Sequence, residues 1–251
     1  MLAQSFSQTG SIREDNQDHL LIDPELRLAI IADGHGAAGK VLAEQTAVAM
    51  HQRLREISAV TGGDENLSRL SEAYEMACQT VTSQTGDDNR CAIDAAWISR
   101  GTIAVFATGT CRLLTSLPES NEWREQRELA LPAGDGMSIL LVSEGAAAAL
   151  SSLQLQPALN GLLSQTDSES FTAFADQTTA IYDGDDCSAI LLRLDSSDLT
   201  AGTPHELELF EHYNRSYSCK LWVPLSIAGC VGLAAIATAS KLKPLMNRIK
   251  N

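Results

Sequence analysis

Residues 28–39 read Leu-Ala-Ile-Ile-Ala-Asp-Gly-His-Gly-Ala-Ala-Gly. Five apolar residues end in one carboxylate, Asp33, and glycines follow at positions 34 and 36. An apolar strand would hold the carboxylate rigidly, and the glycines would let the backbone turn closely and present a carbonyl oxygen, which suits a hard divalent cation. An ordinary Asp-Gly turn after a strand gives the same short pattern, so other segments must decide.

Composition sets the class of protein. The 251 residues (26.9 kDa) suffice for one main domain with a substantial core and a short appendage. Lys and Arg total 18 against 32 Asp and Glu, and the net charge of -14 argues against a nucleic-acid partner. The six cysteines show no Cys-x-x-Cys spacing and the five histidines no zinc spacing, which indicates reduced, structural thiols. The N-terminus has no basic region before an apolar run, so we expect no secretory signal.

The C-terminal part of the chain differs from the rest. Residues 221–240 are 20 uncharged residues between Lys220 and Lys241, which matches the length of a transmembrane helix; a buried hydrophobic helix is the alternative. We therefore predict a globular domain over 1–195, a polar linker over 196–220, a single transmembrane helix over 221–240 and a short basic tail over 241–251. Without a signal the globular domain is expected in the cytoplasm. The basic tail also favours the cytoplasmic side, which conflicts with this expectation because a single span puts its two flanks on opposite sides of the membrane.

Hydrophobic periodicity predicts an α+β domain. Two strands form a hairpin around the turn at Asp23, and helices then follow over 38–57 and 67–82. Further strands are predicted at 92–98, 102–107, 113–116 and 138–142, with a polar loop at 117–128, helical pieces from residue 146 onward, a helix over 171–182 and a closing strand after Asp185.

Carboxylates recur where predicted strands begin or end. The strand 138–142 is followed by Ser143, Glu144 and Gly145, which repeats the order of strand, acid, glycine and helix seen at Asp33. Asp185 stands just before the closing strand. A single acidic turn is usually solvated. Three carboxylates converging at sheet edges would suit Mg²⁺ or Mn²⁺ better than zinc.

Five short motifs occur in an order that resembles one family. Residues 10–18, Gly-Ser-Ile-Arg-Glu-Asp-Asn-Gln-Asp, are close to Gly-x-x-Arg-x-x-Asn-(Glu/Gln)-Asp, and residues 32–36 read Ala-Asp-Gly-His-Gly. Residues 109–112 (Gly-Thr-Cys-Arg), 143–145 (Ser-Glu-Gly) and 185–188 (Asp-Asp-Cys-Ser) stand for Gly-Asp-Ser-Arg, Ser-Asp-Gly and Asp-Asn-x-(Ser/Thr). Over residues 8–194 the chain therefore resembles the metal-dependent protein phosphatases (PPM family), the type 2C serine/threonine phosphatases.

The resemblance implies a fold and an activity. The fold would be a four-layer α-β-β-α sandwich of two antiparallel sheets flanked by helices. The activity would be hydrolysis of phosphoserine or phosphothreonine on protein substrates by water activated between two Mn²⁺ or Mg²⁺ ions, in signalling opposed to a cognate serine/threonine kinase. The predicted anchor would place this activity at a membrane.

The resemblance also assigns roles to residues. Asp33 would bridge the two metals. The other metal ligands would be the Gly34 carbonyl, Glu144 and Asp185, with Gln17 and Asp18 acting directly or through water. Arg13 would hold the substrate phosphate through paired guanidinium donors. His35 would protonate the leaving oxygen or orient a water at the metals.

Three departures keep a second function open. Glu144 has one methylene more than the usual Asp, Thr110 replaces a carboxylate, and the segment between Arg112 and Ile139 is short, so the flap over the site is reduced. The alternative is a catalytically degenerate domain that serves as a phosphoprotein-binding or regulatory module.

Overall fold

A computed structural model describes residues 1–57, 63–85, 91–99, 101–117, 120, 122–164, 168–182, 184–196 and 208–209. Among these residues no helix combines the length and the apolar character needed to cross a membrane. The predicted transmembrane helix (221–240) and basic tail (241–251) lie outside the described residues, so both stay predictions. The four cysteines in the described part of the chain are buried, and none of them forms a disulfide with another described residue.

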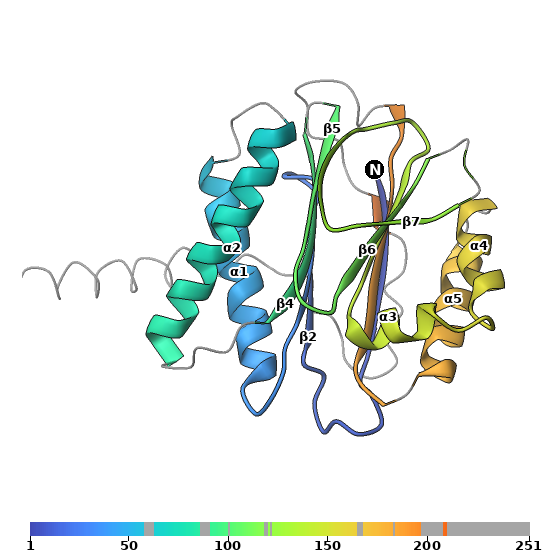
Figure 1. Ribbon diagram of the computed structural model, residues 1–251, viewed down its shortest axis with the longest axis horizontal. Coiled ribbons are helices and arrows are strands. Elements are labelled where there is room, and N and C mark those ends of the chain that lie inside the picture. The colour runs from blue at the N-terminus through green and yellow to red at the C-terminus, as the bar shows by residue number, and fades with distance from the viewer. Residues whose placement is uncertain are drawn as a thin grey trace, which may run out of the picture. The chain divides into compact units, whose positions relative to one another are not determined.

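Two sheets form the centre of the domain (Figure 1). The first has the order β11-β1-β10-β9-β6-β7, and the second has the order β2-β3-β4-β5-β8. All neighbouring strands are antiparallel except β11, which runs parallel to β1. The strands of the first sheet are β1 (Leu2–Gln8), β6 (Arg112–Ser116), β7 (Arg124–Gln126), β9 (Ser138–Val142), β10 (Cys187–Arg193) and β11 (Glu208–Leu209). Those of the second are β2 (Asp18–Asp23), β3 (Leu28–Asp33), β4 (Ala92–Ser99), β5 (Thr102–Ala107) and β8 (Glu128–Pro132).

Helices cover the outer face of each sheet (Figure 1). Helices α1 (Gly39–Ile57) and α2 (Gly63–Thr85) pack on the second sheet. Helices α3 (Glu144–Leu150), α4 (Gln156–Ser164) and α5 (Ser168–Ile181) pack on the first. The α+β class with two sheets and flanking helices is thus confirmed.

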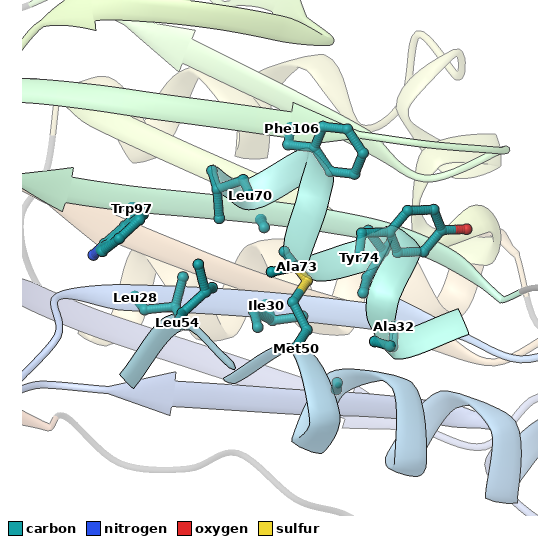
Figure 2. Close-up of a cluster of buried hydrophobic side chains, with 14 of the residues drawn as sticks. Leu28, Ile30, Ala32, Met50, Leu54, Leu70, Ala73, Tyr74, Trp97 and Phe106 are labelled. Atoms are coloured by element: carbon teal, nitrogen blue, oxygen red, sulfur yellow. The ribbon is translucent and has the colours of Figure 1, made fainter. Parts of the chain in front are cut away.

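Strand β3 shows why residues 28–33 are so apolar. Leu28, Ile30 and Ala32 face α1 and α2, where they pack against side chains such as Met50, Leu54 and Leu70 (Figure 2). Ala29 and Ile31 point the other way, into the core between the two sheets. A strand buried on both faces is read as a continuous apolar run rather than as an alternating one.

Several element boundaries differ from the predictions. Strand β1 was not predicted, because Gln4 and Ser5 are buried in it although their side chains are polar. The predicted loop 117–128 contains β7, a three-residue edge strand with two charged residues, which carries little apolar signal. Helices α2, α3 and α5 begin at Gly63, Glu144 and Ser168, a few residues before the predicted starts. The predicted polar linker contributes β11 to the edge of the first sheet.

Candidate metal centre

Asp33 and Glu144 meet where the ends of two strands come together. Asp33 is the last residue of β3, and Glu144 is the first residue of α3, directly after β9. The backbone N–H of Glu144 donates to Oδ2 of Asp33 at 2.8 Å. The carboxylate at the end of β3 thus accepts a hydrogen bond from the first N–H of α3, which has no partner within the helix. The Asp33 side chain is 7% exposed. Burial raises its pKa to about 6, although the Glu144 amide and His35 act in the opposite direction.

His35 lies between these two acids. Its Nδ1 is 3.8 Å from Oδ1 of Asp33, and its Nε2 is 3.7 Å from Oε2 of Glu144. One possible ligand atom from each of the three residues lies within 4.8 Å of the others. The two carboxylates suit a hard divalent cation, with water completing its coordination, and the imidazole is placed to orient such a water.

Thr110 takes part in this arrangement although it carries no charge. Its Oγ1 donates a hydrogen bond of 2.7 Å to Oε2 of Glu144. Thr110 stands where the sequence resemblance leads us to expect a carboxylate. In this chain it orients the longer acid at position 144, so the two departures are in direct contact.

The glycines beside both acids are required by close backbone approaches. A Cβ on Gly34 would lie 2.0 Å from the carbonyl oxygen of Gly39. A Cβ on Gly145 would lie 2.3 Å from the carbonyl oxygen of Asp186. Neither contact leaves room for a side chain, so packing requires the glycine after each acid.

Arg13 and Asp185 form an ion pair across the site. Nε of Arg13 is 2.8 Å from Oδ1 of Asp185, and Nη2 is 3.1 Å from Oδ2, an arrangement of two parallel hydrogen bonds. Nη1 of Arg13 donates to Oε1 of Gln17 at 3.1 Å. Although burial acts to raise it, the pKa of Asp185 lies below its usual value because Arg13 stabilises the charged form. Arg13, the predicted phosphate-binding residue, thus neutralises Asp185, a predicted metal ligand.

Asp186 fixes the loop that carries Arg13, and sequence reasoning gave it no role. Its Oδ1 accepts the backbone N–H of Gly10 at 3.0 Å, and its Oδ2 accepts that of Gln17 at 2.7 Å. Burial raises the pKa of Asp186, and these two amides partly offset the effect. The Gln17 side chain then donates to the Gly36 carbonyl at 2.8 Å. The loop is therefore tied both to the start of β10 and to the glycines after β3.

Asp18 lies directly opposite Asp33 in the β2–β3 ladder. Both of its carboxylate oxygens are buried, and neither makes a hydrogen bond within the described part of the chain. Burial raises the pKa of Asp18 well above its usual value, and the charge of Asp33 adds to the effect, while the hydroxyls of Ser188 and Ser143 act against it. Buried carboxylate oxygens normally have partners, so this pair fits a cation or an ordered water.

Asp94 is a second buried acid, and no role was predicted for it. It lies in β4 opposite Ile31, on the face that looks into the core between the sheets, and it is 0% exposed. As with Asp18, both oxygens lack a hydrogen bond among the described residues. One acid inside the run Ala-Ile-Asp-Ala-Ala was the signal that could have identified it.

The structure therefore places the predicted site residues in two groups. Asp33, His35 and Glu144 form one cluster, with Asp18 beside Asp33 and Gly34 at the turn. Arg13, Gln17 and Asp185 form the other, joined by hydrogen bonds. Their roles as ligands and catalytic groups stay predictions.

No protein-family model matches the sequence, and no curated protein matches it. Several solved structures do match the fold of this chain. PppA, a key regulatory component of T6SS in Pseudomonas aeruginosa, superposes with a TM-score of 0.62 at 18% identity over 76% of this chain and 97% of that chain. The chain has the fold of the PPM serine/threonine phosphatases.

Two further structures with the PPM fold match equally well. MsPP of Mycobacterium smegmatis, a PPM Ser-Thr phosphatase in complex with cacodylate, has a TM-score of 0.62 at 17% identity over 77% of this chain and 98% of that chain. The catalytic domain of PstP in complex with 2 manganese ions has a TM-score of 0.63 at 17% identity, with the same coverage. This chain therefore spans nearly the full length of these PPM domains.

Proposed function

We propose that this protein is a metal-dependent protein serine/threonine phosphatase. The observation that carries the proposal is the convergence of Asp33, His35 and Glu144 within 4.8 Å in a chain with the PPM fold. Beside them lies the buried carboxylate of Asp18, which makes no hydrogen bond with the described residues. Asp33, Glu144, Asp18 and the Gly34 carbonyl would hold Mn²⁺ or Mg²⁺, with two ions as in the PstP structure. Such ions supply positive charge for the phosphate oxygens and activate water for attack.

Arg13 would bind the phosphate group of the substrate. Its guanidinium already offers two parallel donors to the carboxylate of Asp185, and a phosphate accepts the same arrangement. The side chains of Arg13 and Asp185 are 26% and 19% exposed, so exchanging one partner for the other needs no movement of the core. Released Asp185 would then be available as the further ligand that the sequence predicts.

His35 would handle the proton of the leaving group. Water adds to phosphorus, the bond between phosphorus and the serine or threonine oxygen breaks, and that oxygen must take up a proton. His35 is 43% exposed, is oriented by an acid on each side of its ring, and belongs to the residue type that carries protons near neutral pH. No nucleophile of the chain is needed, so Ser143 and Ser188 have structural roles.

A second candidate function rests on the Arg13–Asp185 pair. If Arg13 does not leave Asp185 for a phosphate, the chain would be a degenerate phosphoprotein-binding or regulatory module. Phosphate release from a phosphoserine peptide separates the two, with the full-length chain in detergent and Mn²⁺ or EDTA. Turnover that requires Mn²⁺ supports the phosphatase. Binding of the peptide without turnover under any divalent cation supports the module and contradicts our proposal.

We also propose that residues 221–240 tether the domain to a membrane on its cytoplasmic side, where a serine/threonine kinase supplies the phosphoprotein. The support is the 20-residue uncharged stretch and, for the side of the membrane, the buried thiols of the described cysteines, which suit a reducing compartment. Tethering would raise the effective concentration of the enzyme near membrane-bound substrates. Protease added to intact cells should leave the domain whole, and protease added to opened cells should digest it; digestion in intact cells would contradict the orientation.

A further inference from the structure

A pocket of about 460 Å³ opens on the outer side of the first sheet. Strands β6 and β7 form one wall, through Arg112 and Glu125, and the ends of α3 and α4 form the other. Glu122 and Trp123, just before β7, complete the strand side. The pocket contains none of the predicted metal ligands.

The pocket begins beside the metal centre and leads away from it. Arg112 is two residues beyond Thr110, which hydrogen-bonds to Glu144, and Arg112 pairs in the β6–β9 ladder with Val142. At the far end the pocket is lined by the last residue of α3, the helix that starts at Glu144. Seven helical residues span about 10 Å. An extended polypeptide covers that distance in about three residues.

Charge changes sign along this path. In the β6–β7 ladder Glu125 lies opposite Leu114, so it is farther from the metal centre than Arg112. Trp123 and Glu122 lie farther still along the chain that enters β7. The pocket therefore has its cation nearest the predicted phosphate position and its acids farther out. A substrate that follows this path with a phosphate at one end would meet carboxylates at the other.

The outer part of the pocket combines a fixed indole with two accessible carboxylates. The Trp123 N–H donates to the Leu159 carbonyl at 3.0 Å, which holds the ring in place. Glu122 is exposed and forms no ion pair with any described residue. Glu125 lies 3.8 Å from Arg112 and 3.6 Å from Arg127, and such exposed pairs are weak. An aromatic face beside carboxylates is an arrangement that binds guanidinium or ammonium groups.

We propose that this pocket is a substrate subsite for a basic side chain, arginine in particular, about three residues from the phosphorylated serine or threonine. The inference rests on the proposed phosphatase function and names its substrate class. The arginine stem would lie on Trp123, and its guanidinium would replace Arg112 and Arg127 as the partner of Glu125, with Glu122 as a second acceptor. Lysine would bind less well because it lacks the planar guanidinium group, which can stack on an indole ring and pair with a carboxylate at the same time.

The test compares matched phosphopeptides with the full-length chain in Mn²⁺. In each matched pair one peptide carries arginine and the other alanine at a single position, two to five residues on either side of phosphoserine. The readout is kcat/KM for the arginine peptide divided by kcat/KM for the alanine peptide. We expect a preference for arginine of about tenfold at one position near three residues away. Effects on turnover that are common to both peptides cancel in this ratio. Equal values at all positions would overturn the proposal.

Two variants locate the preference. The double substitution Glu122→Gln with Glu125→Gln should reduce the ratio to near one, because both acceptors of the arginine lose their charge. The matched control, Glu56→Gln with Glu72→Gln on α1 and α2, removes two exposed acids from the other side of the domain and should keep the full ratio. A preference that survives the first pair overturns the assignment to this pocket.

Hydrolysis of para-nitrophenyl phosphate, which is too small to reach the pocket, reports the proposed function separately. If the wild-type chain hydrolyses neither this compound nor the peptides, the phosphatase function fails. The subsite is then tested by affinity of the same peptides, measured by fluorescence polarisation. Tighter binding of the arginine peptide that the Glu122/Glu125 pair abolishes supports the subsite, and equal binding overturns it.

Discussion

Asp94 is a carboxylate in the core between the sheets that makes no hydrogen bond with the described residues, so replacing it should stabilise the fold. Its neighbours on that face of the sheets are apolar, among them Ile31, Ala96 and Ile98. Burial raises the pKa of Asp94 well above its usual value, and the nearby Val142 amide and the Arg127 charge offset this only in part. Asp94→Asn keeps the shape of the side chain and removes the charge.

The size of the effect depends on pH. With a raised pKa, the folded chain retains a proton that the unfolded chain releases above about pH 4, so stability is lost as the pH rises from that value toward the folded pKa. An unpaired buried charge costs about 1–3 kcal/mol or more. For a chain of this size 1 kcal/mol corresponds to about 2–4 °C. We therefore expect Asp94→Asn to raise the melting temperature by about 3–10 °C at pH 8 and by little at pH 4–5.

The assay is thermal unfolding of metal-free protein, followed by circular dichroism between pH 4.5 and pH 8. Asp135→Asn is the control, because Asp135 is exposed and its replacement should leave the melting temperature unchanged throughout. If Asp94→Asn lowers the melting temperature at pH 8, the carboxylate has a stabilising partner and the reasoning is refuted. A gain that does not depend on pH would also refute it, because the charge would not be its cause.

Three further predictions test contacts of the fold and site. Asp23→Asn should destabilise the chain by about 1.5–3 kcal/mol in urea unfolding, because a neutral amide replaces the buried carboxylate that contacts His51 at 2.6 Å and Arg55 at 2.8 Å; an unchanged midpoint would contradict this. Gly145→Ala should weaken Mn²⁺ binding at least about tenfold in calorimetric titrations, because its Cβ would lie 2.3 Å from a carbonyl oxygen and displace the first turn of α3; wild-type affinity would show that the backbone adapts. Thr110→Val should weaken Mn²⁺ binding about threefold to tenfold, since the partly exposed Glu144 loses its 2.7 Å hydrogen bond, whereas Thr110→Ser should retain the affinity.

The elements that were predicted correctly have sequence patterns that span only a few neighbouring residues. Strand β3 is apolar throughout because both of its faces are buried, and the pairing of β4 with β5 follows from a short turn between two apolar runs. Strand β1 escaped prediction because its buried polar side chains break the apolar pattern, and its partner β10 lies nearly 200 residues later in the chain. The polar edge strand β7 has no apolar face from which to be recognised.

The site was predictable as a set of residue types and not as a set of contacts. The resemblance drew attention to Asp33, Glu144 and His35, and the fold brings these three side chains together. The pairing of Arg13 with Asp185 joins residues 172 positions apart, and no local pattern carries that information. No local pattern predicts the hydrogen bonds that Asp186 accepts from the backbone of Gly10 and Gln17 either, which hold the loop of Arg13 in place.

The initial rate of phosphate release from a phosphoserine peptide, measured against Mn²⁺ concentration for the wild-type chain and for Asp33→Asn, tests the central claim most directly. We expect a rate for the wild type that rises with Mn²⁺ to saturation and falls to background in EDTA. We expect a loss of at least about a hundredfold for Asp33→Asn, because the acid at the centre of the cluster is removed. Equal rates for the two proteins, or a wild-type rate that EDTA leaves unchanged, would contradict it.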